Sequence, residues 1–341
     1  MNAPDLSIII PVYNRGDVIR YTLESVRRAS AGLGVETIIV DDGSAPPTAD
    51  TLARLGFTPS QLVRQNNQGL LFARLAGLAR ATGRNVLFLD SDDLVSPDKF
   101  RLQLAAMDAA GAEVSYSDSA HCVLEGDYEA LTITSDSPAP DATDSTEFCL
   151  VVQPAPHSPI FRTDWLRQAV DQAFFPPSPL YNSVAEIWFY HNAAPRRGRA
   201  VRVPGPHTIV GAHPGARLTN HWEKLGVASL AVMEAFARTC PDTPDAPRAR
   251  QFVAEAAFRS WRTLPRDFNP EFCERIMALW RKLGPGRTKN IGGRYFQVLA
   301  HLLGPLPAAR LLHRFQSRPY AQIHTMTDDE FERLLRALPA P

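Results

Sequence analysis

The N-terminal part of the chain alternates between short apolar runs and stretches of helical period. The apolar runs that predict strands lie at 6–10, 37–40, 61–63 and 86–89. The segments between them that place apolar residues on one helix face are 18–28, 48–56 and 71–81. A strand–helix alternation of this kind predicts a mostly parallel sheet with right-handed crossovers, in a nucleotide-binding half of Rossmann type.

The rest of the chain shows two further patterns of predicted secondary structure. Up to residue 220 the pattern predicts helices at 97–110, 163–173 and 183–194, a strand at 113–118, and edge strands at 201–203 and 207–210. Residues 119–146 are rich in Ser, Thr, Asp and Pro and predict a hairpin or an insertion. Beyond 221 only helices are expected, at 222–239, 246–264, 271–283, 294–303, 308–316 and 328–338.

Carboxylates follow two of the predicted strands at the point where each ends. Asp41 and Asp42 come after the second strand, and Asp90, Asp92 and Asp93 come after the strand at 86–89. Ligands of open α/β sheets gather beyond the carboxyl ends of such strands. Several carboxylates close together are electrostatically unfavourable unless a cation offsets their charge. A divalent metal that carries a phosphate is the expected cation. In Asp90-Ser91-Asp92 the two acids share one side of an extended segment.

The end of the first strand supplies a third edge of the same site. Pro11 ends the hydrogen-bond ladder, and Tyr13 and Asn14 follow it. The aromatic ring of Tyr13 offers a face on which a base could stack. Arg74, just inside the helix at 71–81, could pair with a carboxylate of either cluster or with a phosphate, or form a surface salt bridge.

Composition excludes some classes of protein. The 341 residues are 45% hydrophobic and 21% charged with a net charge of zero, which argues against a dedicated nucleic-acid binder. No run approaches the roughly 20 apolar residues of a membrane span, and the N-terminus lacks the pattern of a signal peptide. We therefore expect a cytoplasmic protein. The four cysteines show no CxxC spacing and predict neither a disulfide framework nor a zinc site.

The charge is unevenly spread. Residues 247–318 hold 14 Lys and Arg against 4 Asp and Glu. This segment could touch anionic lipid at the inner face of a membrane or a phosphate-bearing acceptor, or it could be an ordinary solvated surface. Within it, 294–315 is the most amphipathic stretch, which is compatible with an interfacial helix or with packing onto the catalytic domain.

Four sequence motifs, taken in order, resemble those of the family 2 glycosyltransferases. They are Ser7–Arg15, Val40–Ser44, Asn67-Gln68-Gly69 with Ala73-Arg74, and Phe88–Asp93. The resemblance covers roughly residues 5–220 and implies a GT-A fold, inverting transfer of a sugar from a nucleotide-sugar donor, and Mg²⁺ or Mn²⁺ as cofactor. By the same resemblance Asp92 would bind the metal, Asp90 the ribose or a metal-bound water, and Asp42 the uracil ring.

The later parts of the resemblance are less regular. The family opens an aromatic helix with a Glu-Asp pair whose Asp is the catalytic base; here Ala185 and Glu186 take those places. The base would then be Glu186, although a lone Glu in a first turn can simply offset the helix dipole. His213 resembles the family's late histidine that reaches the metal or diphosphate, with a solvent-facing loop residue as the alternative. His157 and Ser158 resemble its acceptor-side wall.

The sequence therefore predicts an inverting, metal-dependent glycosyltransferase, with a UDP-sugar as the default donor and a glycan or lipid-linked acceptor. The donor contacts expected are Pro11, Tyr13, Asn14, Asp42, Arg74, Asp90, Ser91 and Asp92. The predicted domains are 1–220, divided at 118 into donor and acceptor halves, and a helical extension over 221–341. One alternative is a sugar-nucleotide-binding module that has lost catalysis. Another, a nucleotidyltransferase, is disfavoured because no Gly-rich phosphate loop follows the first strand.

Overall fold

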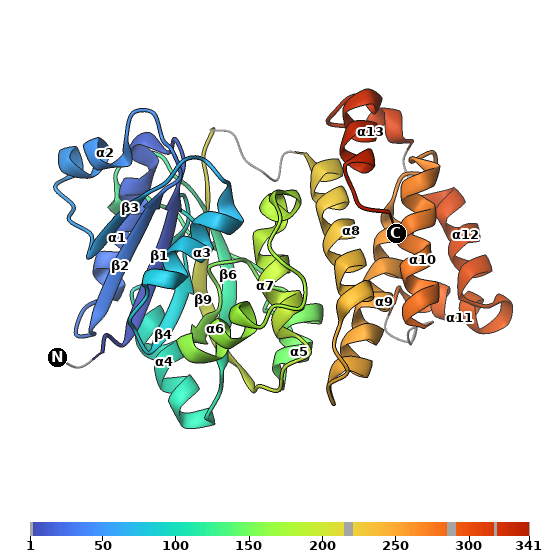
Figure 1. The fold of residues 1–341 in the computed structure, drawn as a ribbon, viewed down its shortest axis with the longest axis horizontal. Coiled ribbons are helices and arrows are strands. Elements are labelled where there is room, and N and C mark those ends of the chain that lie inside the picture. The colour runs from blue at the N-terminus through green and yellow to red at the C-terminus, as the bar shows by residue number, and fades with distance from the viewer. Residues whose placement is uncertain (1–2, 215–220, 285–290, 317–318, 341) are drawn as a thin grey trace. The chain divides into compact units, whose positions relative to one another are not determined.

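The computed structural model describes residues 3–214, 221–284, 291–316 and 319–340. The chain forms two compact units (Figure 1). The first comprises 1–173 and 196–215, and the second comprises 174–195 and 216–341. Residues 174–195 thus group with the C-terminal helices, whereas the sequence places them in a domain that ends at 220. The division at 220 stays a prediction.

All the strands that the structure describes belong to one sheet in the first unit. They are β1 (Leu6–Val12), β2 (Val35–Asp41), β3 (Gln61–Arg64), β4 (Asn85–Phe88), β5 (Leu94–Val95), β6 (Val114–Val123), β7 (Thr134–Ser135), β8 (Ile160–Arg162) and β9 (Ala200–Ala212). The order is β3-β2-β1-β4-β8-β6-β9-β5, with β7 beside β6. The first four strands of that order are mutually parallel, as expected, and β8, β5 and β7 pair antiparallel with their neighbours.

Helices cover both faces of this sheet. Those of the first unit are α1 (Ile19–Ala29), α2 (Thr48–Leu55), α3 (Leu70–Arg80), α4 (Lys99–Ala110), α5 (Ser145–Glu147) and α6 (Thr163–Asp171). Short 3₁₀ segments lie at Gly16–Val18 and Tyr128–Ala130, and a π-turn at Phe148–Val152. Because successive side chains of a strand point to opposite faces, β1 contributes side chains to the hydrophobic layers on both faces of the sheet. Ile8 packs toward α1 and α4, while Ile9 meets Gly77 of α3.

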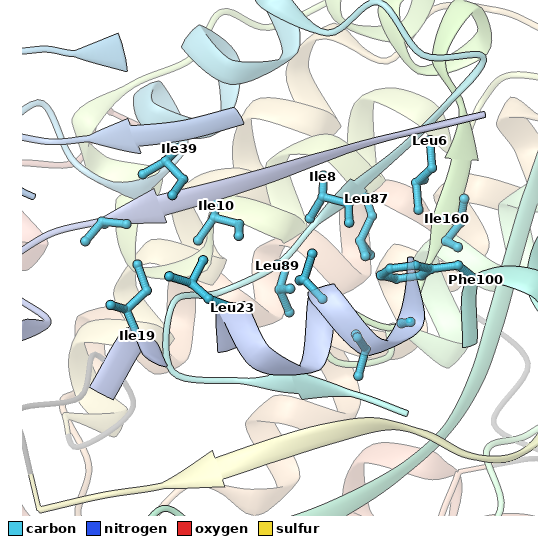
Figure 2. Packing of buried hydrophobic residues seen from close by; sticks show 14 of the residues in the cluster. Leu6, Ile8, Ile10, Ile19, Leu23, Ile39, Leu87, Leu89, Phe100 and Ile160 are labelled. Atoms are coloured by element: carbon cyan, nitrogen blue, oxygen red, sulfur yellow. The ribbon is translucent and has the colours of Figure 1, made fainter. Parts of the chain in front are cut away.

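The core on the α1 and α4 side holds the strand ends in place (Figure 2). Ile8 and Ile10 of β1 pack with Leu87 of β4, Leu23 of α1 and Phe100 of α4, and these side chains are almost completely buried. A fully buried aliphatic or aromatic side chain contributes about 1.5–3 kcal/mol relative to an exposed one. The loops that leave β1 and β4 therefore start from rigid positions.

Two parts of the sheet differ from the pattern-based expectation. Residues 201–203 and 207–210 lie in one strand, β9. Thr208 and Ile209 pair with β6 on one side and with β5 on the other, so the expectation of an edge strand at 207–210 is wrong. Residues 201–203 pair with β6, and β5 does not reach them. Strands β5 and β8 are short and pair only with distant segments, so no local period marks them.

The second unit is helical throughout its described residues. Its helices are α7 (Ala185–Ala193), α8 (Trp222–Thr239), α9 (Ala246–Thr263), α10 (Pro270–Leu283), α11 (Arg294–Leu303), α12 (Pro305–Gln316) and α13 (Asp328–Arg336), with 3₁₀ segments at Pro179–Val184 and Tyr320–Gln322. All seven helices coincide with predicted ones to within a few residues. No helix in the described part of the chain has the length and apolar character needed to cross a membrane.

Aromatic rings and one buried ion pair hold this unit together. The guanidinium of Arg275 on α10 donates to both carboxylate oxygens of Glu234 on α8, at 2.9 and 2.7 Å. The ring of Phe236 on α8 contacts Phe174 and His191, which explains why 174–195 pack with the C-terminal helices. Burial lowers the pKa of His191 to about 4, so its imidazole is neutral in this interior.

Candidate functional site

Three strand ends meet at one edge of the first unit's sheet. Val12 of β1 is paired with Asp41 of β2, and Ile9 of β1 is paired with Phe88 of β4. Because these strands are parallel, the loops that follow them leave the sheet at the same edge. The two carboxylate clusters and the Tyr13-Asn14 segment therefore lie together, as the sequence predicts.

The loop after β1 is fixed to the loop after β2. The backbone N–H of Asn14 donates to the hydroxyl of Ser44 at 3.0 Å, and the amide oxygen of Asn14 accepts from the N–H of Ala45 at 2.8 Å. Asn14 has a φ of 51°, a left-handed conformation that asparagine tolerates better than most residues. The expectation that Pro11 ends the ladder is wrong, because Pro11 is buried within β1 and Val12 still pairs with Asp41. The Tyr13 residue beyond the strand is 51% exposed. The exposed ring is available for stacking.

The first acidic pair is tightly held by its own loop. Asp41 accepts from the N–H groups of Ser44 and Thr48 and from the Arg64 guanidinium. Burial raises the pKa of Asp41, but the hydrogen bonds from Ser44 and Thr48 outweigh burial and leave the pKa below its ordinary value. This carboxylate therefore shapes the loop and has little capacity for a ligand.

Asp42 is anchored by the loop that precedes α3. Its oxygens accept from the Gln65 side chain and from the N–H groups of Gln68 and Gly69, at 2.8 to 2.9 Å. A carboxylate has about four acceptor sites, so room for one further donor remains. Asp42 as a whole is only 4% exposed. The expected contact of Asp42 with a base stays a prediction.

Arg74 is paired with the second cluster. Its side chain is completely buried, and its guanidinium donates to Asp90 at 2.7 Å. Of the alternatives weighed for Arg74, the structure therefore contains the pair with a cluster carboxylate and excludes a surface salt bridge. The Asp90 side chain keeps 25% of its surface exposed, whereas Ser91 is buried. Asp90 is thus more accessible to a ligand than either Arg74 or Ser91.

Asp92 is the point where three segments converge. Its Oδ2 lies 2.9 Å from Nε2 of His213, which follows β9, and 3.3 Å from the guanidinium of Arg15, which follows β1. His213 is not a solvent-facing loop residue, because only 4% of its side chain is exposed. No role for Arg15 is expected from the sequence, although this residue stands inside the first motif. Its contact depends on a register between β1 and β4 that no local pattern reveals.

Asp93 clamps this loop onto β9. One of its oxygens accepts from the N–H of Gly211 at 2.9 Å, and the other lies 3.0 Å from Nδ1 of His157. Asp93 is not the cap of the next helix, because α4 begins later, behind Asp98. Because His213 is two residues beyond Gly211, this clamp sets the distance between His213 and Asp92.

Gly211 permits a close approach that no other residue allows. A Cβ atom at Gly211 would overlap the backbone carbonyl oxygen of Asp92 and press on Leu124. We expect Gly211→Ala to lower the free energy of unfolding by about 1–3 kcal/mol, the usual cost of overpacking. Thermal unfolding would measure this as a lower melting temperature.

Gly226→Ala is the matched control. Gly226 lies in α8, and the nearest atom to an added Cβ would be Cζ of Phe272 at 3.6 Å, an ordinary contact. Alanine favours a helix over glycine by roughly 0.5–1 kcal/mol, so this variant should melt no lower than the wild type. Equal melting of Gly211→Ala and the wild type would contradict the clamp.

His157 and Ser158 are interior residues. Both are completely buried, and the Ser158 hydroxyl donates to the backbone oxygen of Ser117. The Ser158 carbonyl accepts from the ammonium of Lys99 at 2.8 Å, and burial holds the pKa of Lys99 well below its ordinary value. These contacts make the segment part of the scaffold behind Asp93. The expected acceptor contact of His157 and Ser158 stays a prediction.

Glu186 belongs to the second unit. It lies in the first turn of α7, partly buried, directly after the completely buried Ala185. Trp188 of the same helix is completely buried and donates to the backbone oxygen of Phe175. The start of α7 is therefore fixed within the second unit. The assignment of Glu186 as a base stays a prediction.

The chain matches known proteins over its N-terminal part. Residues 7–167 match the family model described as Glycosyl transferase family 2. The succinoglycan biosynthesis protein ExoO of Rhizobium meliloti (strain 1021) is 36% identical over 124 residues, which cover 36% of this chain and 35% of that protein. The chain spans 35% to 55% of the length of the first curated relatives that it matches.

Solved structures resemble a larger part of the chain. The S. aureus TarS 1–349 complex with UDP-GlcNAc has a TM-score of 0.64 at 17% identity and covers 91% of this chain and 90% of its own. The Pyrobaculum calidifontis mannosyltransferase PcManGT in complex with GDP-Man and Mn²⁺ has a TM-score of 0.50 at 16% identity, with coverages of 92% and 80%. Identities this low show the fold alone. The expected GT-A fold with a helical C-terminal region is confirmed.

Proposed function

We propose, from the match of residues 7–167 to the model of glycosyl transferase family 2, that the protein transfers a sugar from a nucleotide-sugar donor to a hydroxyl of a glycan or lipid-linked acceptor. The observation that carries the proposal is the meeting of Asp92 and His213, 2.9 Å apart, at the edge where β1, β2 and β4 end. This is the edge where open α/β sheets bind nucleotides. A role in polysaccharide biosynthesis agrees with the name of the succinoglycan relative.

The donor's nucleoside would occupy the loops after β1 and β2. The half-exposed ring of Tyr13 supplies a stacking surface for the base. Asp42 would accept a ring N–H with its remaining acceptor site, and the exposed side of Asp90 would face the ribose. Pro11, Asn14 and Ser91 would shape the loops, and Arg74 would act by holding Asp90 in place.

The residues around Asp92 fit a divalent metal. A carboxylate oxygen and an imidazole nitrogen are ligands that suit Mn²⁺, and Mg²⁺ takes the carboxylate. The described residues contain no group of three or more His, Cys, Asp or Glu side chains arranged for a metal. An ion held by Asp92 and His213 alone would need phosphate oxygens and water as its other ligands, as is usual for Mg²⁺. When bound, the metal would offset the charge that develops on the leaving diphosphate.

Glu186 would take the proton from the acceptor hydroxyl. Inverting transfer needs a general base on the side opposite the leaving group. The first turn of α7 favours an ionised carboxylate, because the positive end of the helix dipole lies there. The absence of an acid at Ala185 supports the second candidate function, a module that binds the donor without catalysis.

Donor binding and donor hydrolysis separate these functions. We expect a UDP-sugar to raise the melting temperature more than a GDP- or dTDP-sugar, since a ligand that binds only the folded protein stabilises it. The UDP-GlcNAc complex of TarS favours UDP as the first choice, and the GDP-Man complex of PcManGT makes GDP a necessary comparison. Hydrolysis of the preferred donor in the presence of Mn²⁺, and its loss in EDTA, would support the enzyme.

A shift in melting temperature without any release of sugar would instead support the binding module. No shift with any nucleotide sugar would contradict both functions. The cytoplasmic location expected from the sequence remains part of this proposal.

A further inference from the structure

Helix α11 presents a row of large apolar side chains to solvent. Tyr295, Val298 and Leu302 are 86%, 60% and 71% exposed. Their spacing of three and four residues places them on one side of the helix. Leu303, at 50%, widens the row. Three neighbouring apolar side chains at such exposures are unusual for a surface helix, whose outer side is normally polar.

The inner side of α11 is already used for packing. Phe296 is 1% exposed, its ring contacts that of Phe258 on α9, and the Arg262 guanidinium lies 4.0 Å from its centroid. The two alternatives considered for this stretch, packing and an interfacial helix, are therefore compatible. One side of α11 packs onto its own unit, and the row Tyr295–Val298–Leu302 faces outward.

The sequence around this row carries charge of a single sign. From Lys282 to Thr327 it contains seven Lys and Arg residues and no Asp or Glu, whereas the preceding Arg275 and Arg281 are paired with Glu234 and Glu274. Arg294 lies next to Tyr295 at the start of α11, and Arg310 is exposed on α12. An apolar row within a basic, acid-free stretch is complementary to a surface that is both apolar and anionic.

We propose that α11 docks the protein onto an anionic lipid bilayer, with Tyr295, Val298 and Leu302 inserted among the headgroups. A helix of ten residues is ~15 Å long, too short to cross a bilayer but suited to lying in its interface. Tyrosine is favoured at that depth because its ring is apolar and its hydroxyl is polar. A second copy of the chain fits less well, since two basic surfaces would repel each other.

Vesicle co-sedimentation of the full chain tests the proposal. The protein should sediment with vesicles of phosphatidylcholine containing about 30% phosphatidylglycerol, and binding should fall at least tenfold with phosphatidylcholine alone or in high salt. Tyr295→Ser/Leu302→Ser should reduce binding by a similar factor. The single variant Val298→Gln should weaken it in the same direction and preserves the test if the double variant fails to fold.

Val123→Ser/Ile133→Ser is the matched control, because it removes apolar side chains that are 56% and 50% exposed in the other unit. It should bind vesicles like the wild type. Equal binding of the control and the α11 variants, or no binding to anionic vesicles, would overturn the proposal. The proposal would also be overturned if light scattering showed that the wild type is a dimer and that the α11 variants are monomers. Donor hydrolysis in solution should be unchanged in all variants, so the proposed activity is judged separately.

Discussion

Glu186→Gln is expected to reduce the turnover of sugar transfer by about 10²–10⁴-fold, the usual contribution of general base catalysis. Glutamine keeps the size and hydrogen-bonding capacity of the side chain but cannot accept the acceptor's proton at neutral pH. Affinity for UDP should stay within about twofold of the wild type, because the proposed donor contacts lie in another part of the chain. Steady-state kinetics with donor and acceptor, together with calorimetric titration of UDP, would measure both quantities.

Glu274→Gln provides the comparison for this variant. Glu274 lies on the surface of α10 in the same unit and pairs with Arg281. Its replacement removes one negative charge at an exposed site, where an ion pair contributes little. Turnover of this variant should equal that of the wild type. Normal turnover of Glu186→Gln would show that another group is the base.

Helices and buried parallel strands could be predicted from the sequence because their signals are local. Every helix from α8 to α13 repeats apolar residues at helical period, and β1, β2 and β4 are short apolar runs bounded by turn residues. Strand β8 and strand β5 gave no such signal. Each is two or three residues long and is defined only by pairing with strands far away in the sequence.

The position of the candidate site could be predicted from the sequence, but the contacts that hold its loops in place could not. Parallel strands bring their carboxyl ends to one edge, so the meeting of the two acidic clusters followed from the order of elements. The role of Gly211 could not be predicted from the order of elements. It depends on the close approach of the loop that carries Asp92 to β9, a strand more than a hundred residues later in the chain. The contacts of Asp93 were not predictable for the same reason, because its partners Gly211 and His157 lie on β9 and before β8.

The acids at this edge are offset partly by the protein itself. Arg64 pairs with Asp41, Arg74 pairs with Asp90, and Arg15 lies beside Asp92. The protein's own guanidinium groups therefore offset part of the charge for which the sequence calls for a cation, and of these only Arg74 was foreseen as a partner of the clusters. It follows that a metal on Asp92 would compete with the Arg15 guanidinium for one oxygen. The metal should thus bind more strongly together with a diphosphate, which can accept the displaced guanidinium.

Asp92→Asn is expected to remove the dependence of UDP affinity on the metal. In the wild type, replacing Mn²⁺ with EDTA should weaken UDP binding, whereas in the variant the two conditions should give the same Kd. Donor hydrolysis should fall by about 10²-fold or more, since a bound metal supplies several kcal/mol of charge stabilisation. Asparagine preserves the volume of the side chain, so the loop between β4 and β5 should keep its packing.

Asp98→Asn distinguishes this effect from a general loss of charge. Asp98 lies close by in the sequence, its side chain is 60% exposed, and it forms an ion pair with Arg101. The variant should keep both the wild-type Kd and the response to EDTA. If Asp92 merely positioned Arg15, then Asp92→Asn would weaken UDP binding equally in Mn²⁺ and in EDTA. That result would exclude Asp92 as a metal ligand while leaving the donor site in place.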